Sequence, residues 1–425
     1  MLRSLLVDIG PLRRSPLFRS LFVARFVLLF GVGLVAVTVP LQVYSLTGST
    51  PMVSAVAAAE GFAFFAGFLT GGVLADRRDR WAVIVWSTSV CGLSFVGLAL
   101  NAVLLDAVWP VFLFVVLNGL SGSIGITALL AVLPELVDES ELHAVGALNT
   151  VAMRLGTVLA PVTSGAVFAI AGPGWNYGAG AVTALSAWLL LLMTARRRGA
   201  QPSGTPAREP GPVSAVEGPL RAMLSGYRFI VGEPVVRGVM IAGVVGMCGG
   251  GSLVLIPAFV DAELGGDPAV VGLMYSALSV GLIVGAVGSG RLGGTARPGR
   301  LLLLMMILSF LCYVAVGLSS AVPVVLVFVV AAGASVSIEE VLRYALLQIR
   351  TPGAMLGRVN SVFGAQNMSG AAVGALVAGV FGSVFGPADA FWIYNAVMAV
   401  VSVVVLAALP GLRRVAGGER HVEVR

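Results

Sequence analysis

The sequence predicts an all-α membrane protein whose twelve transmembrane helices form two pseudo-symmetric six-helix bundles. Three observations support this fold class. Only 11% of the 425 residues are Asp, Glu, Lys or Arg, and the mean hydropathy is +1.00. Apolar stretches of about 20 residues, the length that a helix needs to cross a bilayer, recur throughout the chain. Short motifs of the first half also return in the second half in the same order.

The long apolar stretches, which carry few charges, define the expected spans. These cover residues 21–46, 52–75, 81–105, 108–133, 145–171, 177–195, 235–260, 269–292, 301–318, 322–347, 359–385 and 391–409. The chain has 55 glycines, which favour close helix packing because small residues let backbones approach in lipid. Examples are Gly61, Gly67, Gly71, Gly370, Gly374 and Gly379.

A polar segment rich in Pro, Ser and Gly separates the halves, and it is too polar to join a core. After it, apolar residues recur at helical spacing between arginines, which predicts an amphipathic helix on the inner membrane face. We expect a first bundle at 1–195, a cytoplasmic linker with this helix at 196–232, a second bundle at 233–412 and a cytoplasmic tail at 413–425.

Loop charges predict the orientation. All 26 basic residues are arginines. Those in the connections between spans lie in alternate connections, whereas the connections between these carry no arginine and only acids. The positive-inside rule then places both termini in the cytoplasm and the chain in the cytoplasmic (inner) membrane. The connection with Asp138, Glu139 and Glu141 is acidic, but acids count for little in this rule.

Composition also excludes several functions. Without lysine the chain has no Walker A motif and no Schiff-base lysine. Cys91, Cys248 and Cys312 stand singly in apolar spans, and two histidines are too few for a histidine metal cluster. No hydrolase or metalloprotease motif is present. We therefore expect no enzyme, no cofactor and no metal site. The arginines flank spans, so they indicate a membrane face and not nucleic-acid binding.

Three pairs of motifs repeat in order. Gly146-Ala-Leu-Asn149 matches Gly357-Arg-Val-Asn360, Gly172-Pro173 matches Gly386-Pro387, and the loop at 72–80 has a diverged counterpart at 290–300. These matches indicate a six-plus-six duplication. Paired bundles bind substrate near the membrane midplane between the halves and expose it alternately to each side.

The chain resembles the major facilitator superfamily over essentially its whole length. Gly72-x-x-x-Asp76-Arg77-x-x-Arg80 is similar to that superfamily's cytoplasmic signature, which latches the two halves in the outward-facing state. Asp79 stands where the signature usually has a second glycine. In span five, the residues Gly156, Ala160, Pro161, Ser164 and Gly165 resemble the signature of the superfamily's antiporters, with Ala160 and Ser164 in place of glycines.

Other blocks narrow the resemblance to the bacterial enterobactin (siderophore) exporter group. They are Gly71–Arg77, Thr127–Ala131, Trp175–Gly178, Ser289–Leu292, Ala296–Gly299 and Ala354–Arg358. This resemblance implies a proton-coupled efflux antiporter for a siderophore or related small molecule, working as a monomer in the lipid bilayer. A broad-specificity drug exporter of the same superfamily is the alternative.

Charges within the spans are candidate functional groups, because each costs about 2.5–3.5 kcal/mol at mid-bilayer. Glu60 is a candidate proton carrier; alternatively, it only bonds a neighbouring helix. Arg25 lies close enough to the inner face to snorkel. Arg154 cannot deprotonate and needs an anionic or carbonyl partner inside the protein. Arg25 and Arg154 are candidates for substrate or ion-pair contacts.

Span ten carries Glu339, Glu340 and Arg343. Arg343 lies four residues after Glu339 and three after Glu340, so it can reach either carboxylate on the helix surface. One carboxylate is then left over. The triad is a candidate proton-switched lock, in which protonation frees Arg343 for substrate. Alternatively, the triad is solvated and lines a vestibule near the inner face.

Overall fold

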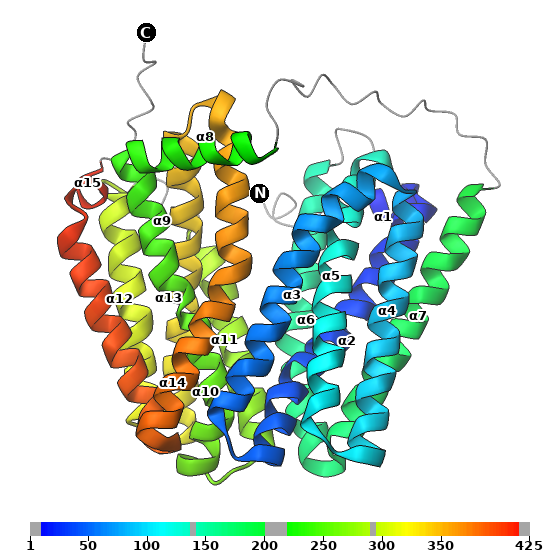
Figure 1. Ribbon diagram of the computed structural model, residues 1–425, viewed down its shortest axis with the longest axis horizontal. Helices are drawn as coiled ribbons and strands as arrows, with labels where there is room; N and C mark the ends of the chain where they lie inside the picture. The colour runs from blue at the N-terminus through cyan, green and yellow to red at the C-terminus, as the bar shows by residue number, and fades with distance from the viewer. Residues whose placement is uncertain (1–9, 137–141, 200–218, 290–294, 416–425) are drawn as a thin grey trace. The chain divides into compact units, whose positions relative to one another are not determined.

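Figure 1 shows the computed structural model, which describes residues 10–136, 142–199, 219–289 and 295–415. The first half contains α1 (Gly10–Arg14), α2 (Pro16–Thr47), α3 (Thr50–Arg77), α4 (Arg80–Leu100), the π-helical turn η2 (Asn101–Leu105), α5 (Val108–Leu136), α6 (Leu142–Ala171) and α7 (Pro173–Gly199). The second half contains α8 (Pro219–Gly232), α9 (Pro234–Met247), α10 (Gly249–Glu263), α11 (Pro268–Ser289), α12 (Pro298–Gly317), α13 (Val322–Arg350), α14 (Gly353–Ala408) and α15 (Pro410–Arg413).

Local sequence explains where the first long helices begin. The Ser15 hydroxyl accepts a hydrogen bond from the Phe18 amide at 3.2 Å, and Ser49 accepts one from Met52 at 3.4 Å. Each serine is followed within two residues by a proline, which suits the first turn of a helix. These caps satisfy amides that helical bonding leaves open.

The membrane-spanning all-α fold is confirmed. Ten helical stretches among the described residues are long and apolar enough to cross a membrane. One of them, Met355–Ala408, contains a break at Gly386, where φ is 76° and ψ is 171°. Gly156–Ala171 forms a shorter apolar helix. Dividing α14 at this break and counting α6 gives a helix count compatible with the twelve predicted spans.

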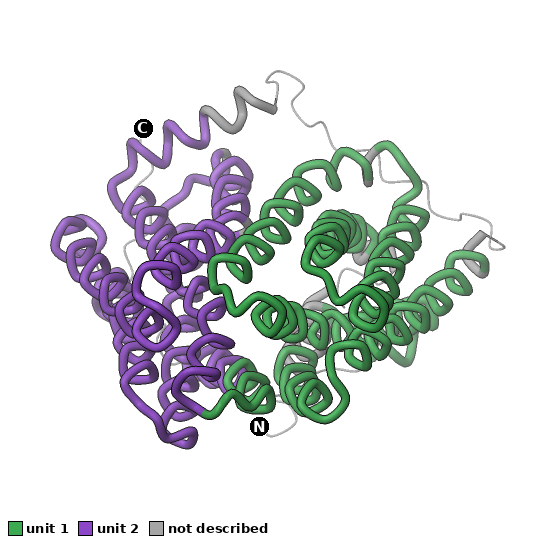
Figure 2. Tube along the Cα trace, turned by 60° about the horizontal axis from the view of Figure 1, so that its bottom comes forward, with its two compact units in different colours: residues 1–202, 265–276 green, residues 203–264, 277–425 purple. Residues whose placement is uncertain are grey.

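The chain divides into two compact units, which Figure 2 colours separately. The first comprises Met1–Pro202 with Gly265–Ser276, and the second comprises Ser203–Leu264 with Ala277–Arg425. The start of α11 is thus grouped with the first unit and its end with the second. The domain limits expected from the sequence stay a prediction.

Span seven differs from the single helix that its sequence predicts. It is interrupted at Cys248, so that α9 ends at Met247 and α10 begins at Gly249. The Tyr394 hydroxyl donates a hydrogen bond to the Cys248 carbonyl oxygen at 2.5 Å. Three consecutive glycines follow, and glycine weakens a helix because it loses the most backbone entropy on folding. Tertiary bonding and local composition together explain the break.

In each half, a tyrosine of the last membrane-spanning helix bonds the first one. These helices are α7 and α2 in the first half, and the part of α14 after Gly386 and the α9–α10 span in the second. In the first unit, the Tyr177 hydroxyl donates to Gln42 Oε1 at 2.8 Å. In the second, Tyr394 bonds Cys248 as described above, and the Ser252 hydroxyl donates to Asn395 Oδ1 at 2.7 Å. Both tyrosines follow a Gly-Pro turn. These equivalent contacts support the duplication that the sequence motifs indicate.

Gly67 and Gly71 let α3 lie directly against α5. A Cβ atom at Gly67 would meet the Leu120 carbonyl oxygen and the Ser123 hydroxyl, and one at Gly71 would lie 2.5 Å from Thr127 Oγ1. The predicted role of these glycines in close helix packing is confirmed.

Gly67→Ala tests this packing. We expect the substitution to lower the free energy of unfolding by about 1–3 kcal/mol, because the backbone of α5 must move away. Gly122→Ala on α5 is the matched control, since no atom lies within 4 Å of its Cβ position. Chemical unfolding of both variants in mixed micelles measures the difference. Equal stabilities would contradict the packing argument.

Candidate functional site

A cavity of about 190 Å³ lies among α2, α3, α4, α5 and α7 of the first unit. Most of its wall is apolar. The polar and thiol groups that line it are Arg25, Glu60, Ser87, Thr88, Cys91 and Asn118. The structure therefore places two of the charged candidates, Arg25 and Glu60, around one space.

Glu60 is held by an amide. Asn118 Nδ2 donates a hydrogen bond to Glu60 Oε1 at 3.3 Å, and the Cys91 thiol donates to Asn118 Oδ1 at 3.1 Å. Gly119 allows this approach, since a Cβ atom there would lie 2.7 Å from the Glu60 carbonyl oxygen. Glu60 makes no salt bridge to any described residue. A carboxyl bonded only by a neutral amide can change its protonation state without leaving a counter-charge buried.

Arg25 lines the same cavity and is half-buried. Its Nε and Nη1 atoms are buried and have no hydrogen-bond partner among the described residues. A guanidinium has five N–H donors and no acceptor, so these atoms require an acceptor that no described residue supplies here.

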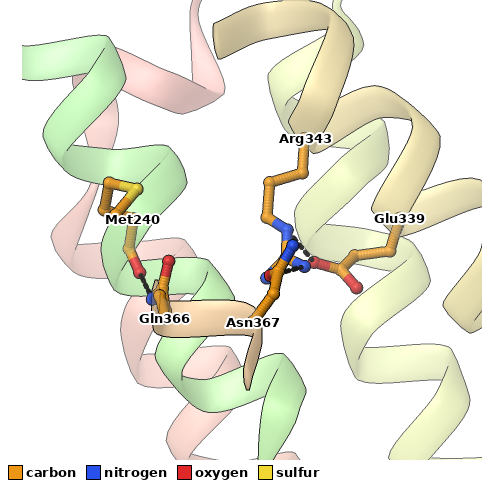
Figure 3. A network of polar contacts seen from close by, with 5 residues as sticks. All are labelled: Met240, Glu339, Arg343, Gln366 and Asn367. Atoms are coloured by element: carbon orange, nitrogen blue, oxygen red, sulfur yellow. Dashed lines mark hydrogen bonds and ion pairs between the residues drawn. The ribbon is translucent and has the colours of Figure 1, made fainter. Parts of the chain in front are cut away.

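A second polar network lies in the second unit and is drawn in Figure 3. Glu339 and Arg343 of α13 are 5% and 3% exposed, with Arg343 Nε 3.7 Å from Glu339 Oε1. Arg343 Nη2 donates to Asn367 Oδ1 of α14 at 3.1 Å, and its guanidinium carbon lies 5.1 Å from the Phe363 ring centroid. Glu340 is exposed. Of the two carboxylates within reach in the sequence, Glu339 is the one that pairs with Arg343.

Glycines of α9 provide the room for this network. A Cβ atom at Gly243 would lie 2.5 Å from Arg343 Nη1, and one at Gly246 would lie 3.3 Å from both Glu339 carboxylate oxygens. Gln366 Nε2 donates to the Met240 carbonyl oxygen of α9 at 2.6 Å, as Figure 3 shows. The buried pair is therefore enclosed by α9, α13 and α14.

Comparison with known proteins identifies the family. The family model described as "Transmembrane secretion effector" matches residues 7–417. The chain belongs to this family of the major facilitator superfamily. Enterobactin exporters of Shigella boydii and Escherichia coli are each 36% identical to it over 416 residues, which cover 97% of this chain and 96% of theirs.

Solved structures share the fold of this major facilitator protein. A bacterial homologue of the human lysosomal transporter Spinster has a TM-score of 0.70 at 14% identity and covers 94% of this chain and 95% of its own. A bacterial homologue of the iron transporter ferroportin has a TM-score of 0.71 at 15% identity and covers 94% and 98%. These structures show the fold alone; the family match and the enterobactin exporters show that the chain is a multi-pass membrane transporter and not an enzyme.

The superfamily's cytoplasmic signature lies at the junction of α3 and α4. Gly72 has open space at its Cβ position, and Arg77 is exposed. Arg80 Nη1 donates to the Ala131 carbonyl oxygen of α5 at 3.2 Å. Asp79, which replaces the usual glycine, accepts a hydrogen bond from the Trp81 amide at 3.1 Å and caps α4. The side chain of Asp76 lies outside the described residues.

The antiporter-like motif of α6 supplies packing contacts within the first unit. Ala160 Cβ lies 2.6 Å from the Cβ position of Gly33 on α2, and the Cβ position of Gly165 lies 2.9 Å from Gly272 Cα. A Cβ atom at Gly272 would also meet the Pro161 carbonyl oxygen, and Gly156 lies beside Leu29 of α2. The side chain of Arg154 lies outside the described residues, as does the acidic segment 137–141.

The sequence interpretation missed three amides of these sites: Asn118, Gln366 and Asn367. A usable signal was present, because uncharged amides within apolar spans commonly bond across helices. Among the described residues, no group of His, Cys, Asp or Glu is arranged to hold a metal ion.

Proposed function

We propose that this chain is a proton-coupled antiporter that exports a siderophore such as enterobactin, or a related small molecule, across the cytoplasmic membrane. The observation that carries the substrate assignment is the 36% identity to enterobactin exporters over 97% of the chain. The aligned region includes both halves of the chain and both polar sites, so the similarity does not come from one shared motif.

Glu60 is the proposed proton carrier. Its partner Asn118 has an amide N–H₂ that donates to an ionised carboxylate and a carbonyl oxygen that accepts from a protonated one. Glu60 can therefore gain or lose a proton without leaving a buried counter-charge unpaired. Arg25 and Cys91 are the other ionisable groups of this cavity. Glu339 already pairs with Arg343, and its proposed role is the lock expected from the sequence. Glu340, which is exposed, stays a further proposed proton-coupling residue, and Arg154 stays a proposed residue for substrate or ion-pair contact.

The proposed cycle uses proton entry to return the carrier for reloading. Arginines in alternate connections favour cytoplasmic termini. In the proposed cycle, a proton from the outside binds Glu60 and is released to the inside before substrate binds. One charge moving through 100 mV supplies about 2.3 kcal/mol. That energy supports about a fiftyfold gradient of a neutral substrate. The signature Gly72, Asp76, Arg77 and Arg80 is the proposed latch between states, and one chain suffices for the cycle.

Export in cells tests this proposal. A siderophore-producing strain that lacks its own exporter should retain enterobactin, and expression of this chain should move most of it to the medium. The measurement is the ratio of external to internal siderophore by liquid chromatography. Efflux of unrelated cations such as ethidium, with no effect on the siderophore ratio, would replace this proposal with a broad drug exporter.

A further inference from the structure

The first-unit cavity offers more than a proton site. Glu60 and Arg25 both line it, yet they form no salt bridge with each other. Arg25 keeps two buried nitrogens without an acceptor among the described residues. A bound group that accepts a hydrogen bond from Arg25 and donates one to Glu60 would provide partners for both side chains.

The hydroxyls of the cavity are also available as acceptors. Ser87 and Thr88 both donate to the Ile84 carbonyl oxygen of their own helix, at 3.0 and 2.8 Å. Their protons are therefore committed, while their oxygen lone pairs stay open to a ligand O–H. The remaining wall includes Leu28, Phe64 and Ile84, which favours a flat apolar body between the polar groups.

The volume limits what can enter. Pockets that hold a drug-sized molecule have about 300–1,000 Å³, whereas this cavity has about 190 Å³. It therefore accommodates one ring-sized group and not a complete large ligand.

We propose that this cavity is a subsite for a single hydroxylated aromatic arm of the transported molecule. The ring lies against the apolar wall, its oxygen accepts from Arg25, and its O–H donates to the ionised Glu60 carboxylate. This subsite rests on the proposed function and gives it a chemical basis. When Glu60 takes up a proton it loses its negative charge, and a charge-assisted hydrogen bond of this kind is about twice as strong as a neutral one. Proton binding therefore weakens arm binding, as antiport requires.

The matched ligands 4-fluorophenol and 4-fluoroanisole test the subsite. They have nearly the same shape, but only the phenol can donate a hydrogen bond. Fluorine NMR line broadening on the purified, detergent-solubilised chain measures binding without any gradient or transport. We expect the phenol to bind about tenfold more tightly or better, because a hydrogen bond to a charged group is strong. Equal binding of the two ligands would overturn the proposal.

Two variants locate the binding. Arg25→Gln removes the charged donor, and Gly122→Leu fills the cavity from α5, where Gly122 lines the wall and has no neighbour within 4 Å. Both should reduce phenol binding about tenfold or more. Gly122→Leu keeps the test valid if Arg25→Gln fails to fold. Phenol binding that neither folded variant alters reflects partition into the micelle and contradicts the subsite.

The outcomes separate the subsite from the proposed function. Enterobactin export without selective phenol binding overturns the subsite alone. Selective phenol binding without any export overturns the transport proposal and leaves a hydroxyaromatic binding site.

Discussion

Replacing Glu339 with Leu lowers the free energy of unfolding by about 3–5 kcal/mol, because it leaves the Arg343 guanidinium buried without the carboxylate it faces at 3.7 Å. Arg343→Met has a similar cost for the opposite reason. Replacing both residues at once removes both charges, and we expect most of the lost stability to return. The pair thus behaves as a coupled unit whose energy appears only when one half is missing.

A double-mutant cycle measures this coupling. Unfolding of the two single variants and the double variant in mixed micelles gives the interaction energy. Glu340→Leu is the control on the same helix, because the Glu340 side chain is exposed and exposed positions usually change stability by about 0.5 kcal/mol or less. A double variant as unstable as the sum of the single variants would show that the two charges do not stabilise each other.

Transport by the double variant separates a structural pair from a lock. A lock is needed to select between states, so we expect the folded Leu/Met variant to lose gradient-driven export. Normal export by that variant would leave Glu339 and Arg343 a structural role only. The distinction matters because buried ion pairs are weak indicators of stability by themselves.

Most of the fold could be predicted from the sequence, because a helix that crosses a bilayer must be long and apolar and because a charge within it is energetically costly. The break in span seven did not follow. Residues 238–260 carry no charge, and the Cys248 carbonyl oxygen at the break accepts a hydrogen bond from Tyr394, 146 positions away. No local pattern reports such a distant donor.

The charged residues of the candidate sites could be predicted from the sequence, but the residues that they contact could not. Glu60, Arg25, Glu339 and Arg343 stand out because each interrupts an apolar span. Neighbours on a helix point about 100° apart, so the rotation of α13 in its unit decides whether Glu339 or Glu340 is buried. That rotation depends on tertiary packing, including the space left by Gly243 and Gly246 of α9.

Glu60→Gln should abolish proton-driven export while the protein stays folded. Gln keeps the size of the side chain and an oxygen that can accept from Asn118 Nδ2, but it cannot release a proton. With a membrane potential of 100 mV, the substrate ratio should fall from as much as about fiftyfold to one. Proteoliposomes with an imposed pH gradient and potential measure this ratio. Glu263→Gln, at an exposed carboxyl that ends α10, is the control and should transport normally.

Exchange of substrate down its own gradient distinguishes lost coupling from lost activity. A Glu60→Gln carrier is neutral at this position, as the protonated carboxyl is, so it binds the substrate arm more weakly but can still move substrate in both directions if the rest of the site is intact. We therefore expect labelled substrate to exchange across the membrane in this variant, with no response to pH. Retention of pH-driven accumulation would remove Glu60 from the mechanism and leave Glu339 as the buried carboxyl to test. Loss of exchange together with accumulation would mean that Glu60 is needed to bind substrate even without a proton gradient.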